Sequence, residues 1–511
     1  MRKILVLFFG LMCLTANALV RVNSLFSDNA VLQRDVEVPL WGTADNNEKI
    51  TVEFNGQKLK TTTTSGKWMV KLKAMHANST PQDLVVRGNN TIVLKNILIG
   101  EVWLCSGQSN LVFEIKKIKP TGNSLTKNEV ITDAKNHPTI RQFLVSRPND
   151  KSVDSIRTEV NGKWTVCDQN SVNEFSAVSY FFARELNRKL QVPIGILNSS
   201  IGGTYGERWV APSELKSNPE LNYINDLYNK SLKELPVRMA RYNKELPAKL
   251  DKFSIDSIEA INNGKSSARK PQPPKIQYEG APGGFYNYMI HPLVNFPIKG
   301  VLWYQGEHNA GVGMAFNYRK LLPSLIKSWR EGFESGDLPF IVVQIPGLQN
   351  QTPEIRESQL LTVKNTPNTG LVVISDVSDT LDVHPGNKQP VGERASLVAL
   401  ALAYNQKIEY SGPVYESMKV EGDKIILSFS HVGKGLISKD GYLRNFEIAG
   451  NDNKFYPATA EIKGNNVVVS NPKVLNPRNV RMGWRNISVC NLYNKEGLPA
   501  SIFRTDFVSG N

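Results

Sequence analysis

The chain has 511 residues, of which 41% are hydrophobic and 21% are charged. This composition can bury several cores and excludes a disordered, collagen-like or disulfide-dense protein. The net charge of +14 is spread along the chain without a nucleic-acid-binding motif, so we expect no nucleic-acid partner.

Residues 1–18 have the pattern of a secretory signal peptide. Arg2 and Lys3 precede an apolar run over residues 4–14, and Ala16, Asn17 and Ala18 form an A-x-A cleavage site. The run is shorter than the ~20 apolar residues that a membrane span needs. We therefore expect cleavage near Ala18 and an exported protein, periplasmic or secreted, without stable membrane insertion.

Residues 19–96 alternate short apolar runs with polar turns. Runs at 36–41, 50–54, 68–72 and 91–94 are separated by turn sequences such as Asn55-Gly56. This spacing predicts an N-terminal β-sandwich module.

Residues 97–410 change to strands that alternate with helices. Strands are expected at 97–105, 194–197, 299–304, 340–345 and 371–375, and helices at 175–190, 318–329, 353–364 and 390–404. The alternation predicts an α/β domain, a parallel sheet with helices on both faces. A charged segment at about 213–276 interrupts it as a helical insertion, and alternating runs from residue 411 to 511 predict a C-terminal β module.

Chemically useful residues follow four of the expected strands. Ser109 follows the first strand, Gly202 and Gly203 the second, Gln305 the third and His384 the last. Ligands of parallel α/β sheets bind beyond the carboxyl ends of the strands. A serine, a glycine pair, an amide and a histidine are the groups that acyl transfer requires.

Each assignment has an alternative reading. Ser109 could be an ordinary turn or helix-capping serine, and Leu111 replaces the second glycine of G-x-S-x-G, which excludes a standard α/β-hydrolase elbow. The glycines could form a turn without a ligand, and Gln305 could hydrogen-bond within its loop. His308 also follows a strand, but we favour His384 as the base.

Four blocks in chain order resemble the sialate O-acetylesterases, which belong to the wider SGNH hydrolase group. They are the sequences at 106–110, 200–204 and 303–307, and His384-Pro385 with residues 388–392. Similarity extends to 31–42 near the start and 491–506 near the end. The resemblance implies a flavodoxin-like three-layer SGNH domain and an esterase that removes O-acetyl groups from sialic acid or related sugars, with neither metal nor cofactor.

The resemblance also implies roles for single residues. Ser109 matches the nucleophile and His384 the general base, with oxyanion donors from Ser109 N–H, Gly202 or Gly203 N–H, and the amide of Gln305. The usual acid stands three residues before the histidine, where this chain has Leu381. Either Asp382 reaches the imidazole by another path, with Asp379 the other nearby carboxylate, or a Ser–His dyad operates with help from a carbonyl.

Six further residues are expected to line the substrate site; they are Gln108, Asn110, Tyr205, Trp209, Glu307 and His308. Tyr205 and Trp209 could equally pack inside the domain. The sequence leaves open an acetylxylan or other polysaccharide acetylesterase, and also a glycan-binding protein without catalysis.

Overall fold

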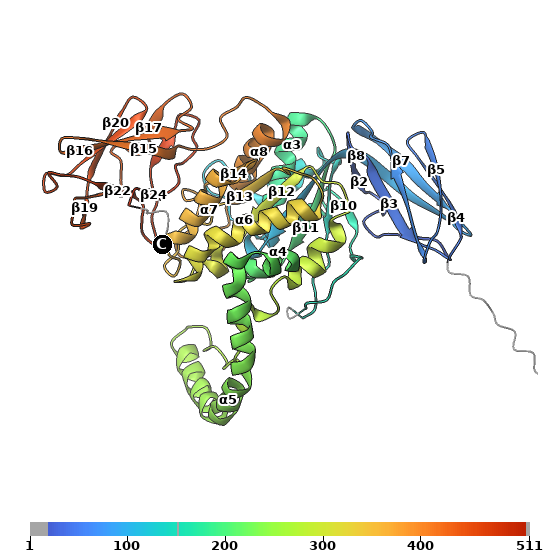
Figure 1. Cartoon of the computed structure of the whole chain (residues 1–511), viewed down its shortest axis with the longest axis horizontal. Coiled ribbons are helices and arrows are strands. Elements are labelled where there is room, and N and C mark those ends of the chain that lie inside the picture. Colours follow the sequence, from blue (N-terminus) through green and yellow to red (C-terminus); the bar gives the residue numbers. More distant parts are fainter. Residues whose placement is uncertain (1–18, 151–152, 507–511) are drawn as a thin grey trace, which may run out of the picture.

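The computed structural model describes residues 19–150 and 153–506, so the predicted signal peptide lies outside the described residues. An N-terminal β module, a central α/β domain and a C-terminal β module follow one another along the long axis of the molecule (Figure 1). This agrees with the expected α/β domain and its two all-β flanks. Among the described residues, no helix combines the length and apolar character needed to cross a bilayer.

The N-terminal module consists of short strands that bury alternate residues. Every second side chain of β3 and β6 is buried, the period of two that a strand imposes. Asn55 and Gly56, with φ of 47° and 73°, form the predicted two-residue turn between β4 and β5. The strands are β1 (Arg21–Val22), β2 (Val31–Gln33), β3 (Val38–Thr43), β4 (Lys49–Phe54), β5 (Gln57–Thr62), β6 (Lys67–Leu72) and β7 (Asn78–Arg87).

Strand β8 (Thr91–Gly107) belongs to both the N-terminal module and the central sheet. It begins antiparallel to β7, pairs with β2 around Leu98, and then continues between two strands of the central domain. The predicted boundary between residues 96 and 97 therefore falls inside one continuous strand of 17 residues.

The central sheet has the order β10-β9-β11-β8-β12-β13-β14, and only β10 at one edge runs antiparallel to its neighbour. Its strands besides β8 are almost wholly buried, as expected for a sheet covered on both faces. They are β9 (Ile140–Leu144), β10 (Trp164–Val166), β11 (Ile194–Ser200), β12 (Gly300–Tyr304), β13 (Phe340–Val343) and β14 (Thr369–Val372).

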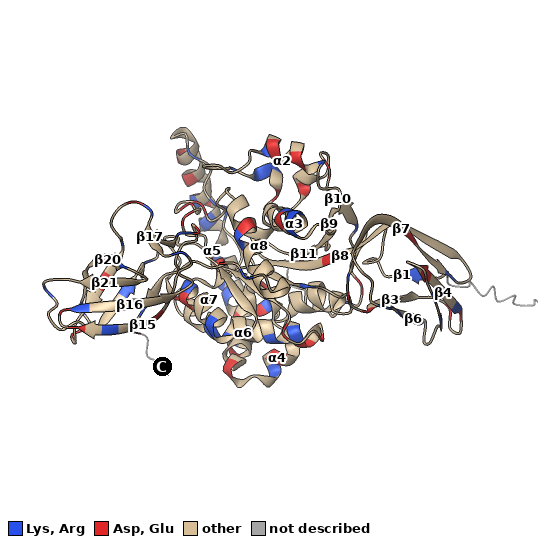
Figure 2. Cartoon of the chain, turned by 90° about the horizontal axis from the view of Figure 1, so that it is seen from above, with Lys and Arg blue, Asp and Glu red and all other residues tan. Residues whose placement is uncertain are grey.

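Helices cover both faces of this sheet. Helices α3 (Ala177–Leu190) and α8 (Gln389–Tyr404) pack together on one face, and α6 (Met314–Gly332) and α7 (Glu354–Asn365) pack on the other (Figure 2). Figure 2 also shows Lys and Arg interspersed with Asp and Glu over the molecule.

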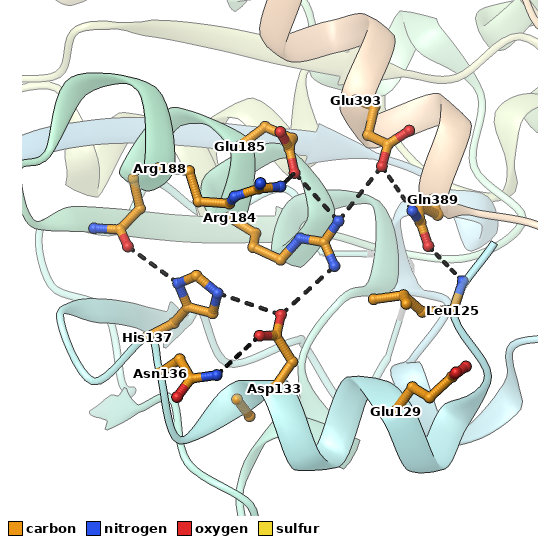
Figure 3. Close-up of polar contacts among 12 residues, drawn as sticks. Leu125, Glu129, Asp133, Asn136, His137, Arg184, Glu185, Arg188, Gln389 and Glu393 are labelled. Carbon is orange, nitrogen blue, oxygen red and sulfur yellow. Dashed lines mark hydrogen bonds and ion pairs between the residues drawn. The ribbon is translucent and has the colours of Figure 1, made fainter. Parts of the chain in front are cut away.

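A polar cluster joins α3 and α8 to the short helix α2 (Lys127–Ala134) (Figure 3). The buried Arg184 guanidinium of α3 lies 3.7 Å from the Asp133 carboxylate of α2 and 3.4 Å from the Glu393 carboxylate of α8. His137 Nε2 lies 3.3 Å from Asp133, and Gln389 donates a hydrogen bond to Glu393. The start of α8 is thereby fixed against its neighbours.

The predicted insertion is helical. It contains α4 (Pro212–Ser217) and the 41-residue helix α5 (Asn222–Asn262), which projects from the domain as a long arm (Figure 1). Pro236 and Pro247 lie inside α5, where each removes a backbone hydrogen-bond donor.

The C-terminal module has a hydrophobic core of its own and begins after α8. Its strands form one sheet of order β15-β16-β21-β20, a second of order β19-β18-β22-β24 and the pair β17-β23. They are β15 (Val414–Glu421), β16 (Lys424–Ser430), β17 (Leu436–Ser438), β18 (Phe446–Ala449), β19 (Phe455–Pro457), β20 (Thr459–Lys463), β21 (Asn466–Ser470), β22 (Asn479–Met482), β23 (Leu492–Asn494) and β24 (Phe503–Arg504).

Charged pairs attach this module to the central domain. Glu357 of α7 is almost fully buried and accepts two hydrogen bonds from Arg504 of β24 and one from Arg319 of α6. A carboxylate held by two guanidinium groups offsets part of the cost of its burial.

Candidate active site

Three strands of the central sheet end side by side. Gly107, the last residue of β8, is paired with Ser200 of β11 and with Tyr304 of β12. The loops that follow these strands therefore start from neighbouring positions at the carboxyl edge of the sheet, where α/β proteins bind ligands.

Gly107 allows the chain to turn sharply at the end of β8. Its φ is 144°, and a Cβ atom there would lie 2.1 Å from the carbonyl oxygen of Tyr304. Only glycine tolerates both conditions. Two residues later, at Ser109, the chain enters a short helix, α1 (Ser109–Val112).

The structure brings Ser109 and His384 together across 275 residues of sequence. The distance from Ser109 Oγ to His384 Nε2 is 2.7 Å. His384 lies in the loop between β14 and α8. A hydroxyl that contacts an imidazole nitrogen in this way can be deprotonated as it attacks, which is the requirement for an activated serine nucleophile.

The surroundings of His384 favour its neutral form. Burial lowers the pKa of His384 below 6.5, the positive charges of Lys388 and Lys117 lower it too, and the carboxylate of Asp382 opposes them. At pH 7 the ring is therefore mainly neutral, the state in which Nε2 can accept a proton.

The two candidate acids contact backbone groups. Asp382 Oδ1 accepts a hydrogen bond of 2.8 Å from the backbone N–H of His384, and Asp379 Oδ1 accepts one of 2.8 Å from the N–H of Leu381. Among the described residues, neither carboxylate makes a hydrogen bond to His384 Nδ1. Asp382 therefore orients the histidine through its backbone and acts on the ring through its charge.

Gly202 lies directly against the serine. A Cβ atom built on Gly202 would be 3.3 Å from Ser109 Cβ, a tight contact, so the backbone after β11 lies directly beside the nucleophile. Gly203 follows with φ of 67°, which keeps the turn tight. Gly202 therefore lies beside the nucleophile, and Gly203 continues the same turn.

Gln305 differs from its predicted role as an oxyanion donor. Its Nε2 donates to the carbonyl oxygen of Thr204 at 3.0 Å and to Asn309 Oδ1 at 2.8 Å, and its Oε1 accepts from the Tyr318 hydroxyl at 2.7 Å. Both amide hydrogens are occupied and the side chain is fully buried. In this structure Gln305 holds the loop after β11, the hydrogen-bonding alternative that the sequence left open.

The expected lining residues fall into two groups. Tyr205 is partly exposed and His308 is exposed, and their rings meet edge to face with centroids 5.1 Å apart. Gln108, Asn110 and Trp209 are fully buried in this structure, whereas Glu307 is partly exposed.

The indole of Trp209 packs in the core. Its ring contacts Phe285 and Trp303, and its Nε1 donates to Thr204 Oγ1. Nothing in the sequence distinguishes an aromatic side chain that stacks on a sugar from one that packs in the core.

Lys388 is a further buried polar residue near the catalytic pair, and sequence reasoning gave it no role. Its Nζ donates to Asn110 Oδ1 at 2.5 Å, and Asn110 Nδ2 donates to Glu307 Oε1 at 2.5 Å and to the carbonyl oxygen of Val383 at 3.0 Å. Burial lowers the pKa of Lys388 to about 7 and raises that of Glu307 to about 6. The sequence signals for Lys388 were its place four residues after His384 and its membership of the block at 388–392.

The described parts of the chain contain no group of three or more His, Cys, Asp or Glu side chains arranged to hold a metal ion.

Known proteins resemble this chain over most of its length. Residues 275–394 match the family model described as a carbohydrate esterase, sialic acid-specific acetylesterase. Sialate O-acetylesterase of Mus musculus is 28% identical over 464 residues, covering 80% of this chain and 79% of the relative. The Homo sapiens protein of the same name is 28% identical over 476 residues, covering 85% of this chain and 79% of the relative.

A solved structure provides a match at higher identity. The crystal structure of a carbohydrate acetylesterase from Xanthomonas citri aligns with a TM-score of 0.79 and 32% sequence identity, covering 96% of this chain and all of that chain. The shared fold extends over the central domain and both β modules at this coverage. The chain therefore belongs to the sialate O-acetylesterase family and is a carbohydrate esterase.

Proposed function

We propose that this esterase hydrolyses O-acetyl esters of sialic acid through an acyl-enzyme formed on Ser109. The observation that carries the mechanism is the 2.7 Å contact between Ser109 Oγ and His384 Nε2 at the carboxyl edge of the sheet. The resemblance of residues 275–394 to sialic acid-specific acetylesterases supports the substrate class.

In the first half of the reaction, Ser109 Oγ attacks the acetyl carbonyl carbon while His384 Nε2 takes the hydroxyl proton. The carbonyl oxygen becomes an oxyanion, which the N–H groups of Ser109 and the glycine pair at 202–203 stabilise. Removing one such donor from an oxyanion hole typically costs ~10²–10³ in rate. His384 then gives its proton to the departing sugar oxygen.

In the second half, His384 removes a proton from water, which attacks the acetyl carbonyl of the acyl-enzyme. Acetate leaves and the Ser109 hydroxyl is restored by the proton on His384. The charge of Asp382 favours the imidazolium that forms in both halves, while its hydrogen bond to the His384 N–H keeps the loop in place. This is a Ser–His pair with an acid that acts without contacting Nδ1.

The strand order supports the finer assignment to an SGNH, flavodoxin-like domain. The strands β11-β8-β12-β13-β14 have the order 2-1-3-4-5 when numbered along the chain, with β9 and β10 added at one edge. This is the flavodoxin-like order. We also propose that the protein is exported, because residues 1–18 have the composition of a signal peptide.

Substrate comparison tests this proposal. Acetate release from O-acetylated sialic acids and from acetylated xylan fragments is measured with the wild-type protein and the Ser109→Ala variant. Faster release from the sialic acids, abolished in Ser109→Ala, supports the proposal. Preference for xylan fragments would assign a polysaccharide acetylesterase, and equal background turnover in both proteins would contradict serine catalysis.

A further inference from the structure

We propose that Asn110, Lys388 and Glu307 form a positioning array that holds Ser109 and His384 at their reactive distance. This inference rests on the proposed function, because it explains how the Ser109–His384 pair is maintained. None of the three residues is assigned a chemical step.

Asn110 connects the two catalytic residues through a short path. Its backbone follows Ser109 directly, and its side-chain Nδ2 donates to the carbonyl oxygen of Val383 at 3.0 Å, the residue directly before His384. The amide side chain therefore ties the serine turn to the histidine loop. Among the described residues, no other side-chain hydrogen bond joins the residue after Ser109 to the residue before His384.

The partners of Asn110 fix the orientation of its amide. The Lys388 ammonium can only donate, so it must meet Oδ1, and it does so at 2.5 Å. The Val383 carbonyl oxygen accepts, and Glu307 Oε1 accepts at 2.5 Å, so both must meet Nδ2. A rotation of the amide by 180° would break all three contacts. Because both ends of the buried Asn110 amide have partners, the side chain has one preferred orientation.

Lys388 places a positive charge beside Asn110, and this charge also acts on His384. It is 1% exposed, with its ammonium over the rings of Phe113 and Tyr304, and it is the first residue before α8. The charged groups that act on His384 are Lys388, Asp382 and Lys117. Because Lys388 lies on the same loop as His384 and is fixed by Asn110, its charge acts at a constant position.

The decisive variant is Asn110→Asp. It keeps the shape and the contact with Lys388, but it places an oxygen against the Val383 carbonyl and the Glu307 carboxylate, so the tie between the two catalytic residues is broken. We expect kcat for an aryl acetate to fall by roughly 10²-fold, the effect of a small misplacement of reacting groups, with KM changed less than threefold because Asn110 is buried.

Asn494 provides a matched control in the C-terminal module. It is also fully buried, and its Nδ2 donates to the carbonyl oxygens of Ser411 and His431 while its Oδ1 accepts from the Leu498 N–H. Asn494→Asp should lower thermal stability in the same way but leave kcat of the folded protein within about twofold of wild type. Equal loss of kcat in both variants would assign Asn110 a merely structural role and overturn the proposal.

A second variant covers the case in which Asn110→Asp does not fold. Lys388→Met removes the positive charge, which raises the pKa of His384, so the acidic limb of the pH profile of kcat/KM should move to higher pH. Glu307→Gln, which keeps an acceptor oxygen for Asn110, should retain at least a tenth of the activity. An unmoved acidic limb together with an unchanged kcat in Lys388→Met would overturn the proposal.

Ser109→Ala separates the two levels of inference. If Ser109→Ala retains wild-type activity, the proposed function fails. If Ser109→Ala is inactive while Asn110→Asp folds and retains kcat within threefold, only the positioning array fails.

Discussion

The protonation state of His384 decides whether Ser109 can lose its proton. Burial and the two lysines lower the pKa of the imidazole, and they outweigh the carboxylate of Asp382. The loop after β14 therefore maintains a base that stays neutral in mildly acidic solution.

The downward shift of the His384 pKa determines the pH dependence of the reaction. A base with a pKa below 6.5 is still mostly neutral at pH 6.5, so kcat/KM for an aryl acetate should be half-maximal at a pH below 6.5 and should level off above it. A pH profile of kcat/KM from pH 4.5 to 9 measures this. An acidic limb centred above pH 6.5 would show that the carboxylate of Asp382 outweighs burial and the lysine charges.

Gly202 provides a second test at the scale of single residues. In Gly202→Ala the new methyl group meets Ser109 Cβ at 3.3 Å, so the serine or the loop must shift by a few tenths of an ångström. We expect kcat/KM to fall at least tenfold with little change in the melting temperature. Gly311→Ala is the control, because nothing lies within 4 Å of its new methyl group. Equal activity in the two variants would show that catalysis does not require the close approach of Gly202 to Ser109.

The sequence predicted which residues lie near the reaction better than it predicted where their side chains point. Ser109, Gly202 and His384 were placed by the rule that strand ends share an edge, which depends only on topology. The direction of Gln305 depends on Thr204, which lies 101 residues away, and on the neighbouring Asn309. Such contacts leave no local pattern.

At the scale of elements, α8 and α3 pack unusually closely at Gly392. A Cβ atom on this residue would lie 2.6 Å from both the Phe181 Cβ and the Phe182 backbone nitrogen of α3. Since backbone cannot move aside as a flexible side chain can, this glycine sets the separation of the two helices. Helix α8 starts directly after Lys388, so its position also sets that of the histidine loop.

Gly392→Ala should therefore disturb both stability and catalysis. Overpacking of this kind typically costs ~1–3 kcal/mol, and the displaced helix start should reduce kcat as well. Thermal unfolding and steady-state kinetics of the same preparation measure the two effects. A melting temperature equal to that of wild type would contradict this prediction, because it would show that α3 and α8 can move apart without loss of folding stability.

Periodicity located most of the elements but not their full extent. The helix expected at 175–190 is α3, and the expected strand at 340–345 contains β13. The continuity of β8 through residues 95–96, between the expected runs at 91–94 and 97–105, was missed, because a strand that leaves one sheet and enters another changes from alternating to continuous burial within its length. That change resembles a boundary between two separate strands.

For the whole molecule, Glu357 is one of the buried residues that attach the C-terminal module to the central domain. Arg504 gives two of its hydrogen bonds, at 2.8 and 3.0 Å, and Arg319 gives another at 2.9 Å. The order of modules could be predicted from sequence patterns. Their attachment could not, because Arg504 and Glu357 are 147 residues apart and each alone resembles a surface charge.

Arg504→Met should weaken this attachment measurably. Glu357 stays paired with Arg319, so we expect a loss of ~1–3 kcal/mol in the free energy of unfolding, less than for a fully orphaned buried charge. Arg444→Met is the matched control in the same module, because its ion pair with Asp440 is solvent-exposed and should contribute less than ~1 kcal/mol. Denaturant titrations of both variants measure the difference, and equal losses would contradict a structural role for the buried pair.

The shared strand β8 makes the N-terminal module part of the catalytic scaffold. A hinge between the two bodies would require a flexible connection, yet the backbone that leaves the sandwich is hydrogen-bonded on its way into the central sheet and ends two residues before the nucleophile. Unfolding of the N-terminal module would therefore remove hydrogen bonds from the strand that leads to Ser109. Removing this module would therefore remove the first half of the strand that leads to the nucleophile.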